Sequence, residues 1–354
     1  MHIALAFNLR KEPVPGVVDS TEPPAEPPSE PPSPDADLYA EWDDIHTITA
    51  VESALASRHR VTRIEATLDA FELFRRTRPD LTFNMAEGLL GSSREAQIPA
   101  LLDMLGLPYT GSDPVTLGIC LDKARTKEIL TYHGVATPRF WTVQSLGELP
   151  SRLRYPLIVK PTLEGSSKGV VDRALVRTRH ELLAQVGWVL ERYRQPALIE
   201  EFLPGREFTV ALLGNGDNLR VLPIVEINLD TLPSGVNPIY SYEAKWVWDT
   251  EEQPLEIFTC PARLEPDLRR QIEETCRQAF RALGCRDWCR IDVRLDAHGR
   301  PAIIELNPLP GILPRPEQNS CFPKAARAAG LSYEQLILAV VEAAATRLNL
   351  AWGA

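Results

Sequence analysis

The sequence has little of what marks membrane-spanning, secreted or nucleic-acid-binding proteins. No stretch among its 354 residues reaches the ~18 uninterrupted apolar residues that a membrane-spanning helix requires. Its 48 Asp and Glu outnumber its 38 Lys and Arg, and this net charge of −10 disfavours a nucleic acid as main partner, because phosphate backbones are bound by clustered cations. The N-terminus, MHIALAFNLR, lacks the basic leader of a signal peptide and predicts a strand. We therefore expect a cytoplasmic protein whose partners are neither membranes nor nucleic acids.

Cysteine is scarce, with six residues spread along the chain and no C-x-x-C pair among them. Structural zinc sites usually contain such pairs. Cys285 and Cys289 are close enough in sequence to suggest metal ligands, but their spacing favours reduced structural thiols instead.

Proline is abundant in one place only. Residues 13–34 hold nine of the 31 prolines, seven of them in the repeat EPPAEPPSEPPSP. Proline cannot donate the hydrogen bonds of helices and sheets, and this stretch has almost no apolar side chain to bury. We predict a solvated, mobile, polyproline-like loop inserted after the first strand, with an SH3-type ligand as the alternative.

Alternating strand and helix patterns predict a parallel α/β domain over residues 1–115. A helical stretch at 43–59 precedes a strand at 60–66, and a further strand ends near Asn84. The next helix is expected to begin at Ser92, which has Glu95 three residues later, and to end at Gly106.

Two further units are expected, a central one at 116–204 and a C-terminal one at 205–354. In the central unit a helix begins at the N-cap Asp122 and ends at Gly134, and a strand then leads into the glycine–serine loop LEGSSKGV. The C-terminal unit contains a strand from Arg206, a strand RVLPIVEI, a long helix near 265–283 and a hairpin at 288–307.

The hairpin is the most informative element. If its DAHG turn is centred between His298 and Gly299, Asp292 faces Glu305 and Arg290 faces Asn307. Side chains alternate along a strand, so these four groups lie on one face. The opposite, core-facing side is expected to carry the following apolar residues: Ile291, Val293, Leu295, Ile304 and Leu306.

Opposed carboxylates repel unless a cation lies between them. Asp292, Glu305 and Asn307 offer only oxygen ligands, which suit Mg²⁺ better than zinc. Arg290 beside them suits a phosphate or carboxylate. In the alternative interpretation the face is solvated and Arg290 pairs with Asp292 and Glu305.

Lys123, Lys160 and Lys245 are candidate phosphate ligands, although each taken alone is more often a surface lysine. The small residues of EGSSKGV predict a loop whose backbone N–H groups can close over phosphates. The spacing is not that of a P-loop, and no G-x-G-x-x-G fingerprint indicates a dinucleotide-binding fold.

Taken in order, the motifs resemble the ATP-grasp superfamily, and within it the D-alanine–D-alanine ligase family. The motifs are LPYTGSD, LDKARTK, IVKP, EGSSKGV, IEEFLPGREFTV, YEAKW, CRIDVRLD, IELNPLPG and PKAARAAGLS. The resemblance implies an α/β, three-domain ATP-grasp fold, with ATP held between the central and C-terminal domains. It also suggests a homodimer.

The same resemblance implies roles for individual residues. Phosphates of ATP would be contacted by Lys123, Lys160 and Lys245, and covered by the loop with Ser166 and Ser167. The adenine and ribose would be held by Glu200, Glu201, Leu203 and Glu207. Two Mg²⁺ ions, with Mn²⁺ as an alternative ion, would be held by Asp292, Glu305 and Asn307. Catalysis would use Arg290 and the Gly311 backbone on an oxyanion, together with Ser166 and Lys245, and Ser320 would lie near the second substrate's carboxylate.

The implied activity is ATP-dependent formation of a peptide bond through an acylphosphate. The sequence departs from the family in three places that concern the substrates. The glutamate that holds the first substrate's ammonium has no certain match here. Lys168 occupies a loop position that is usually apolar in the family, and the link at 312–319 is lengthened. Alternatives are a ligase for other amino acids or peptides, a kinase, or an inactive nucleotide-binding homologue.

Overall fold

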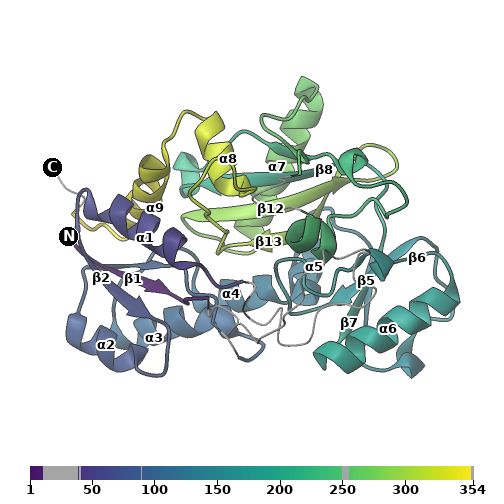
Figure 1. Cartoon of the computed structure of the whole chain (residues 1–354), viewed down its shortest axis with the longest axis horizontal. Helices are drawn as coiled ribbons and strands as arrows, with labels where there is room; N and C mark the ends of the chain where they lie inside the picture. Colours follow the sequence, from purple (N-terminus) through teal and green to yellow (C-terminus); the bar gives the residue numbers. More distant parts are fainter. Residues whose placement is uncertain (11–38, 40, 89, 249–254, 352–354) are drawn as a thin grey trace, which may run out of the picture.

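The computed structural model describes residues 1–10, 39, 41–88, 90–248 and 255–351 (Figure 1). The proline-rich stretch 13–34 lies outside the described residues, so its predicted conformation stays a prediction. The described chain forms three β-sheets with flanking helices, and the predicted α/β class is confirmed.

The first sheet is parallel, has the order β2-β1-β3, and comes from the beginning of the chain. The apolar side chains of β1 alternate between two cores, with Ile3 and Leu5 packing with α1 and Ala4 and Ala6 packing towards α2 and α3. The elements are β1 (His2–Phe7), α1 (Ile45–Ala56), β2 (Arg60–Glu65), α2 (Ala70–Thr77), β3 (Leu81–Asn84) and α3 (Gln97–Leu105).

One predicted helix start is wrong. Ser92 does not cap α3, because Arg94–Ala96 form a 3-10 turn and the α-helix begins only at Gln97. The predicted end is confirmed, since Gly106 adopts a left-handed conformation there, with φ of 63°.

The central sheet is antiparallel, has the order β4-β7-β5-β6, and carries α6 on one face (Figure 1). Asp122 ends α4 and caps α5, accepting hydrogen bonds from the amides of Ala124 and Arg125 as predicted. The elements are α4 (Pro114–Leu121), α5 (Lys123–Tyr132), β4 (Phe140–Val143), β5 (Leu157–Pro161), β6 (Leu175–Val176), α6 (Arg179–Tyr193) and β7 (Ala197–Glu201).

The third sheet has six strands in the order β11-β10-β8-β12-β13, with β9 also paired to β8. The expected strand RVLPIVEI is split into β9 and β10. Helix α7 packs on one face, and α8 and α9 pack on the other together with β1 and α1. The elements are β8 (Glu207–Leu213), β9 (Arg220–Val221), β10 (Val225–Ile227), a π-helix (Ala244–Trp248), β11 (Phe258–Thr259), α7 (Pro266–Ala282), β12 (Trp288–Leu295), β13 (Pro301–Asn307), α8 (Cys321–Ala328) and α9 (Tyr333–Arg347).

The predicted hairpin register is confirmed where it matters for the site. Asp292 pairs with Glu305 and Arg290 with Asn307. A β-bulge beyond Asp292 then shifts the register, so that Val293 pairs with Ile303. The expectation that Ile304 faces the core is therefore wrong. Ile303 is fully buried in the core and Ile304 lines a cavity instead.

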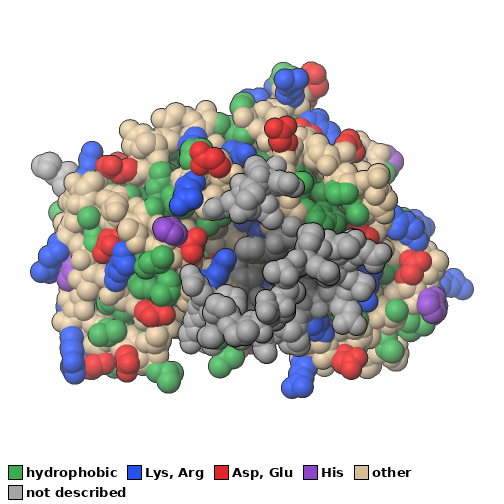
Figure 2. All heavy atoms as spheres, in the orientation of Figure 1, with side chains coloured by type: hydrophobic (Ala, Val, Ile, Leu, Met, Phe, Trp, Pro, Cys, Tyr) green, Lys and Arg blue, Asp and Glu red, His purple; other side chains and the backbone are tan. Residues whose placement is uncertain are grey.

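All six cysteines are free thiols. Among the described residues no single helix has the length and apolar character of a membrane span, and α8 and α9 meet that test only as a pair bent by 99°. Basic and acidic side chains are interspersed over the face seen in Figure 2.

Candidate active site

Two adjoining cavities lie where the central sheet meets the third sheet. The first is lined by residues of β5, β7, β12 and β13. The second, of about 610 Å³, is lined by the glycine–serine loop, by residues just before α1 and by the segment before α8. Asp292 and Glu305 line both cavities. Whatever the two cavities hold therefore meets at these carboxylates.

Nearly all sequence-predicted site residues converge here. The first cavity is lined by Lys123, Lys160, Ser167, Glu200, Glu201, Leu203, Glu207, Asp292 and Glu305. The second is lined by Ser166, Ser167, Lys245, Arg290, Asp292, Glu305, Gly311 and Ser320. Asn307 lines neither cavity, and its Oδ1 accepts a hydrogen bond from the amide of Leu309 at 3.0 Å.

The paired carboxylates are surrounded by cations. Lys123 Nζ lies 3.2 Å from Glu305 Oε2, and Arg290 Nη2 lies 3.2 Å from Asp292 Oδ2. Burial opposes ionisation of Glu305, but Lys123, Lys160 and Arg290 outweigh it and lower the pKa of Glu305 to about 2. Burial raises the pKa of Asp292 despite Arg290. The hairpin thus presents an ionised Glu305 beside Asp292, whose ionised form would be stabilised by a further cation.

This donor set fits a magnesium ion. No three His, Cys, Asp or Glu side chains in the described part of the chain converge as a metal cluster. Mg²⁺ does not need one, because it is usually held by one or two carboxylates together with substrate phosphates and water. The facing oxygens of Asp292 and Glu305 provide such a pair.

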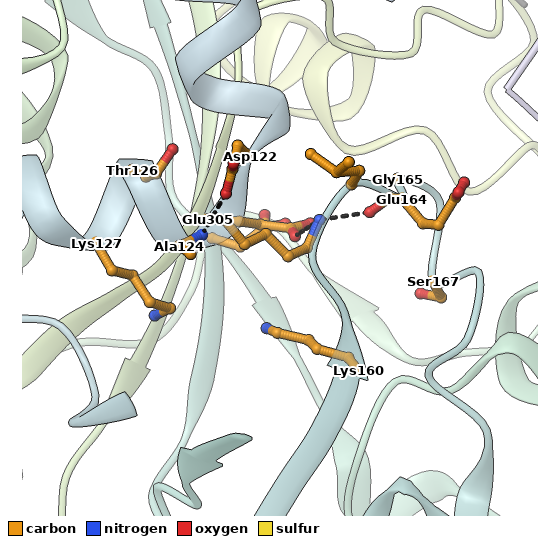
Figure 3. A network of polar contacts seen from close by, with 12 residues as sticks. Asp122, Ala124, Thr126, Lys127, Lys160, Glu164, Gly165, Ser167 and Glu305 are labelled. Atoms are coloured by element: carbon orange, nitrogen blue, oxygen red, sulfur yellow. Dashed lines mark hydrogen bonds and ion pairs between the residues drawn. The ribbon is translucent and has the colours of Figure 1, made fainter. Parts of the chain in front are cut away.

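A buried lysine–glutamate–lysine group lies beside the first cavity. Glu200 is 2.5 Å from the Nζ of Lys127 and 2.7 Å from that of Lys160. Burial, partly offset by Glu200 and reinforced by Lys160, lowers the pKa of Lys127 to about 8. Two lysines share one carboxylate, so this group carries a net positive charge, and Lys160 and Glu200 are its members that line the first cavity. Figure 3 shows Lys127 and Lys160 approaching from α5 and β5, with Glu305 nearby.

Sequence analysis missed Lys127, although a signal was present. Lys123 and Lys127 stand four residues apart on α5, a spacing that places them on one helix face. It also missed Arg294, which bonds Glu207 at 2.8 Å and the carbonyl of Pro238 at 2.9 Å. Arg294 thereby fixes the carboxylate of Glu207 at the cavity wall.

The glycine–serine loop, residues 164–169, adopts an unusual backbone. Ser166 and Ser167 have φ of 50° and 59°, in the left-handed region that side chains usually avoid. Lys123 Nζ donates to the carbonyl of Glu164, and Ser167 Oγ donates to the carbonyl of Tyr240 at 3.2 Å. The first bond ties the loop to α5, and the second ties it to the segment before the π-helix.

The far end of the second cavity contains the predicted catalytic groups. The amide N–H of Gly311 has no acceptor among the described residues. Ser320 Oγ donates to the Gly311 carbonyl at 3.0 Å and accepts from the Leu313 amide at 3.2 Å. Burial, with Arg290 adding to it, lowers the pKa of Lys245 to about 8.

The lengthened segment 312–319 forms one wall of this cavity. Its first residues are fixed by side chains from the following helices, since Arg327 donates to the Pro314 carbonyl at 2.6 Å and Tyr333 to the Ile312 carbonyl at 2.7 Å. Asp43, from the N-cap region of α1, lies on the wall too, and burial together with Asp44 raises the pKa of Asp43 to about 7. Sequence analysis gave no role to Asp43.

The chain is similar in sequence to known proteins and to one family model. Residues 128–342 match the family model described as D-ala D-ala ligase C-terminus. A D-alanine–D-alanine ligase of Bordetella avium is 37% identical over 258 residues, covering 72% of this chain and 75% of that protein. One of Haemophilus influenzae is 36% identical over 267 residues, covering 73% and 82%. A Sinorhizobium fredii protein, y4sG, is 38% identical over 267 residues, covering 75% of each chain.

Solved structures show the same fold over nearly the whole chain. The D-alanine–D-alanine ligase of Bacillus anthracis, solved in complex with ATP, superposes with a TM-score of 0.70 at 22% identity, covering 98% of both chains. The VanG D-Ala:D-Ser ligase of Enterococcus faecalis superposes with a TM-score of 0.67 at 21% identity, covering 97% of this chain and 99% of that one.

Proposed function

Since this chain belongs to the D-alanine–D-alanine ligase family and is thereby an ATP-dependent ligase forming carbon–nitrogen bonds, we propose that it joins the carboxyl group of one amino acid to the amine of another. One observation carries this proposal: Asp292 and Glu305 line both cavities. A nucleotide in the first cavity and an amino acid in the second would meet at these carboxylates.

The chemistry requires the two ligands to meet. A carboxylate is a poor electrophile, so its oxygen first takes the γ-phosphoryl group of ATP, giving an acylphosphate and ADP. The amine of the second substrate then attacks the acyl carbon, and phosphate leaves. Arg290 and the open N–H of Gly311 lie in the second cavity, where they would donate to the developing oxyanion. One such donor contributes roughly 3–4 kcal/mol.

The phosphate groups would be positioned by Lys123, Lys160 and Lys245, and by the glycine–serine loop with Ser166 and Ser167. Phosphoryl transfer depends mainly on positioning and charge neutralisation. Bound Mg²⁺, or Mn²⁺ in its place, would be held by Asp292, Glu305 and Asn307, as the two ions that the family resemblance implies, and would supply charge neutralisation on the phosphates.

Nucleotide binding would use the opposite end of the first cavity. Glu201 and Leu203 line it; Glu201 is the last residue of β7, the strand that carries Glu200, and Leu203 follows that strand. Glu200 would act through its two lysines, because its carboxylate is engaged by Lys127 and Lys160. Glu207, oriented by Arg294, would bind the ribose hydroxyls.

The substrates that we propose include amino acids other than D-alanine. The second cavity, of about 610 Å³, has the long segment 312–319 as a wall, with Arg315 and Gln318 lining it. We propose D-alanine-like amino acids as the first candidates, with larger amino acids or short peptides favoured by this volume. Ser320 would lie beside the acceptor's carboxylate.

Purified protein incubated with ATP, Mg²⁺ and a panel of D- and L-amino acids tests the proposal. We expect amino-acid-dependent phosphate release and a product whose mass equals the two substrates minus water. Free phosphate without any amide product, or a phosphorylated product, would overturn the ligase assignment; the second result would indicate a kinase.

A matched pair of variants tests the metal site in the same assay. Asp292→Asn should abolish turnover, whereas Asp296→Asn, at the turn of the same hairpin and ion-paired with the exposed Arg300, should retain it. Equal activity of both variants would contradict the assigned site. Size-exclusion chromatography with light scattering tests the proposed homodimer.

A further inference from the structure

Four charged side chains, three of them buried and Glu164 partly buried, connect the glycine–serine loop to the first unit of the chain. We call this group the loop clasp; its members are Glu41, Arg94, Glu164 and Lys168. Lys168 Nζ lies 3.0 Å from Glu41 Oε2 and 2.7 Å from Glu164 Oε2. Arg94 Nη2 lies 2.9 Å from Glu41 Oε2 and 3.9 Å from Glu164 Oε2. The side chains of Glu41, Arg94 and Lys168 are each only 7% exposed.

The clasp also holds the loop backbone. Glu41 Oε1 accepts from the Gly165 amide at 2.8 Å, and Arg94 Nη1 donates to the Leu163 carbonyl at 2.8 Å. The fit is close, since a Cβ at Gly165 would lie 2.3 Å from Glu41 Oε1. Both oxygens of Glu41 are therefore occupied by the loop and by its partners.

The charges of the clasp balance, with two cations and two carboxylates. Burying such groups costs a large desolvation energy that is recovered only in good geometry. Burial by itself would raise the pKa of Glu41, but Lys168 and Arg94 outweigh this effect and lower the pKa. Because a single missing partner would leave an uncompensated buried charge, the clasp favours one loop position over displaced ones.

This position matters because of what the loop covers. Ser166 and Ser167, held between the clasp and Tyr240, line the second cavity, and Ser167 lines the first as well. Glu41 comes from the segment before α1. The hydrogen bond from the Gly165 amide to Glu41 therefore joins two segments that are 124 residues apart in sequence.

We propose that Lys168 and Glu41 are positioning residues that hold the loop closed over the reacting phosphate, so that the acylphosphate is transferred to the amine and not to water. This inference rests on the proposed ligase function. In productive turnover a C–N bond forms, the C–O bond to phosphate breaks, and the nitrogen loses a proton to solvent. In the competing leak, water forms a C–O bond at the same carbon, and the starting acid and phosphate are released.

If the clasp excludes water, its loss should change the ratio of phosphate released to amide formed. The loss of a contact with a purely structural role would leave this ratio unchanged. Lys168→Met removes the charge but keeps the length of the side chain. We expect it to raise the ratio of phosphate released to amide formed by about fivefold or more, because an opened loop admits water to the acylphosphate. Lys168→Arg should restore a ratio near that of the wild type. Arg270→Met, which breaks an exposed ion pair on α7, is the matched control and should leave the ratio unchanged.

A second measurement does not depend on turnover. Hydrogen–deuterium exchange of peptides covering residues 163–170, measured with a non-hydrolysable ATP analogue and Mg²⁺, should be faster in Lys168→Met and Glu41→Gln than in the wild type. If a single variant does not fold, the double variant Glu41→Gln/Lys168→Met, which keeps the charges balanced, replaces it.

The outcomes separate the two proposals. A wild type without amide formation overturns the ligase function, and the exchange measurement then still tests the clasp. A wild type that forms amide, together with a Lys168→Met variant that is slower but keeps the wild-type ratio and exchange rate, overturns the clasp.

Discussion

Lys245 illustrates how burial sets the chemistry of a single residue. Its pKa, lowered to about 8 by burial and then by Arg290, lies within the range of ordinary assays. A lysine with a lowered pKa is charged below that pKa and loses its charge above it. The proposed contact of Lys245 to the γ-phosphate of ATP needs the charged form, so we expect it to weaken as the pH rises through about 8.

We therefore expect the KM for ATP to rise about three- to tenfold between roughly pH 7 and 9. Lys245→Met should show a high KM already at pH 7 and a flat profile, measured by steady-state kinetics. Lys245→Arg stays charged over this range and should keep a low KM across it. A steep rise in Lys245→Arg would assign the titration to another group.

At the scale of elements, the bulge in the hairpin of β12 and β13 decides which isoleucine faces the first cavity. Without it, strict alternation would put Ile304 in the core and Ile303 towards the cavity. The bulge places Ile303 opposite Val293 and turns Ile304 to the cavity, immediately before Glu305, the proposed metal ligand.

This arrangement predicts that two neighbouring substitutions affect different properties, one the stability of the protein and the other the binding of ATP. Ile303→Ala should lower the free energy of unfolding by about 2–5 kcal/mol, because the side chain is fully buried. Ile304→Ala should change stability by less than about 1 kcal/mol and mainly weaken ATP binding. Urea denaturation and nucleotide titration measure the two effects. The reverse result would indicate an unbulged register.

At the scale of the whole molecule, the two ends of the chain share one core. Side chains of β1 and α1 pack with α9, and Trp288 of β12 joins the same cluster, as the neighbouring positions of α1 and α9 in Figure 1 show. We retain the division into units at 1–115, 116–204 and 205–354 as a proposal. The shared core implies that the first unit depends on the last one for its stability.

The first cavity, in which we propose that the nucleotide binds, lies between the central and third sheets, so we expect stability to depend on the ligand. A ligand bound only by the folded chain at 100 times its Kd stabilises it by about 2.7 kcal/mol. We expect ATP with Mg²⁺ to raise the melting temperature by about 3–8 °C in differential scanning fluorimetry. EDTA, or Asp292→Asn, should remove most of this rise. A rise that persists in EDTA would argue against metal-assisted binding.

The sequence by itself determined the parts of this protein that depend on near neighbours along the chain. The cap at Asp122, the stop at Gly106 and the facing of Asp292 and Glu305 follow from spacing within one element, and the structure confirms them. The family motifs are also local stretches, which is why the ligase resemblance could be recognised before the fold was known.

Only the tertiary structure decided the rest. The bulge at Ile304 depends on how the strand fits its neighbours, and the clasp joins Glu41 to Lys168 across 127 residues. Sequence patterns report periodicity within an element and carry no information on which distant charges will be buried together. That choice is made by packing, because only the folded chain excludes the water that would otherwise solvate each charge separately.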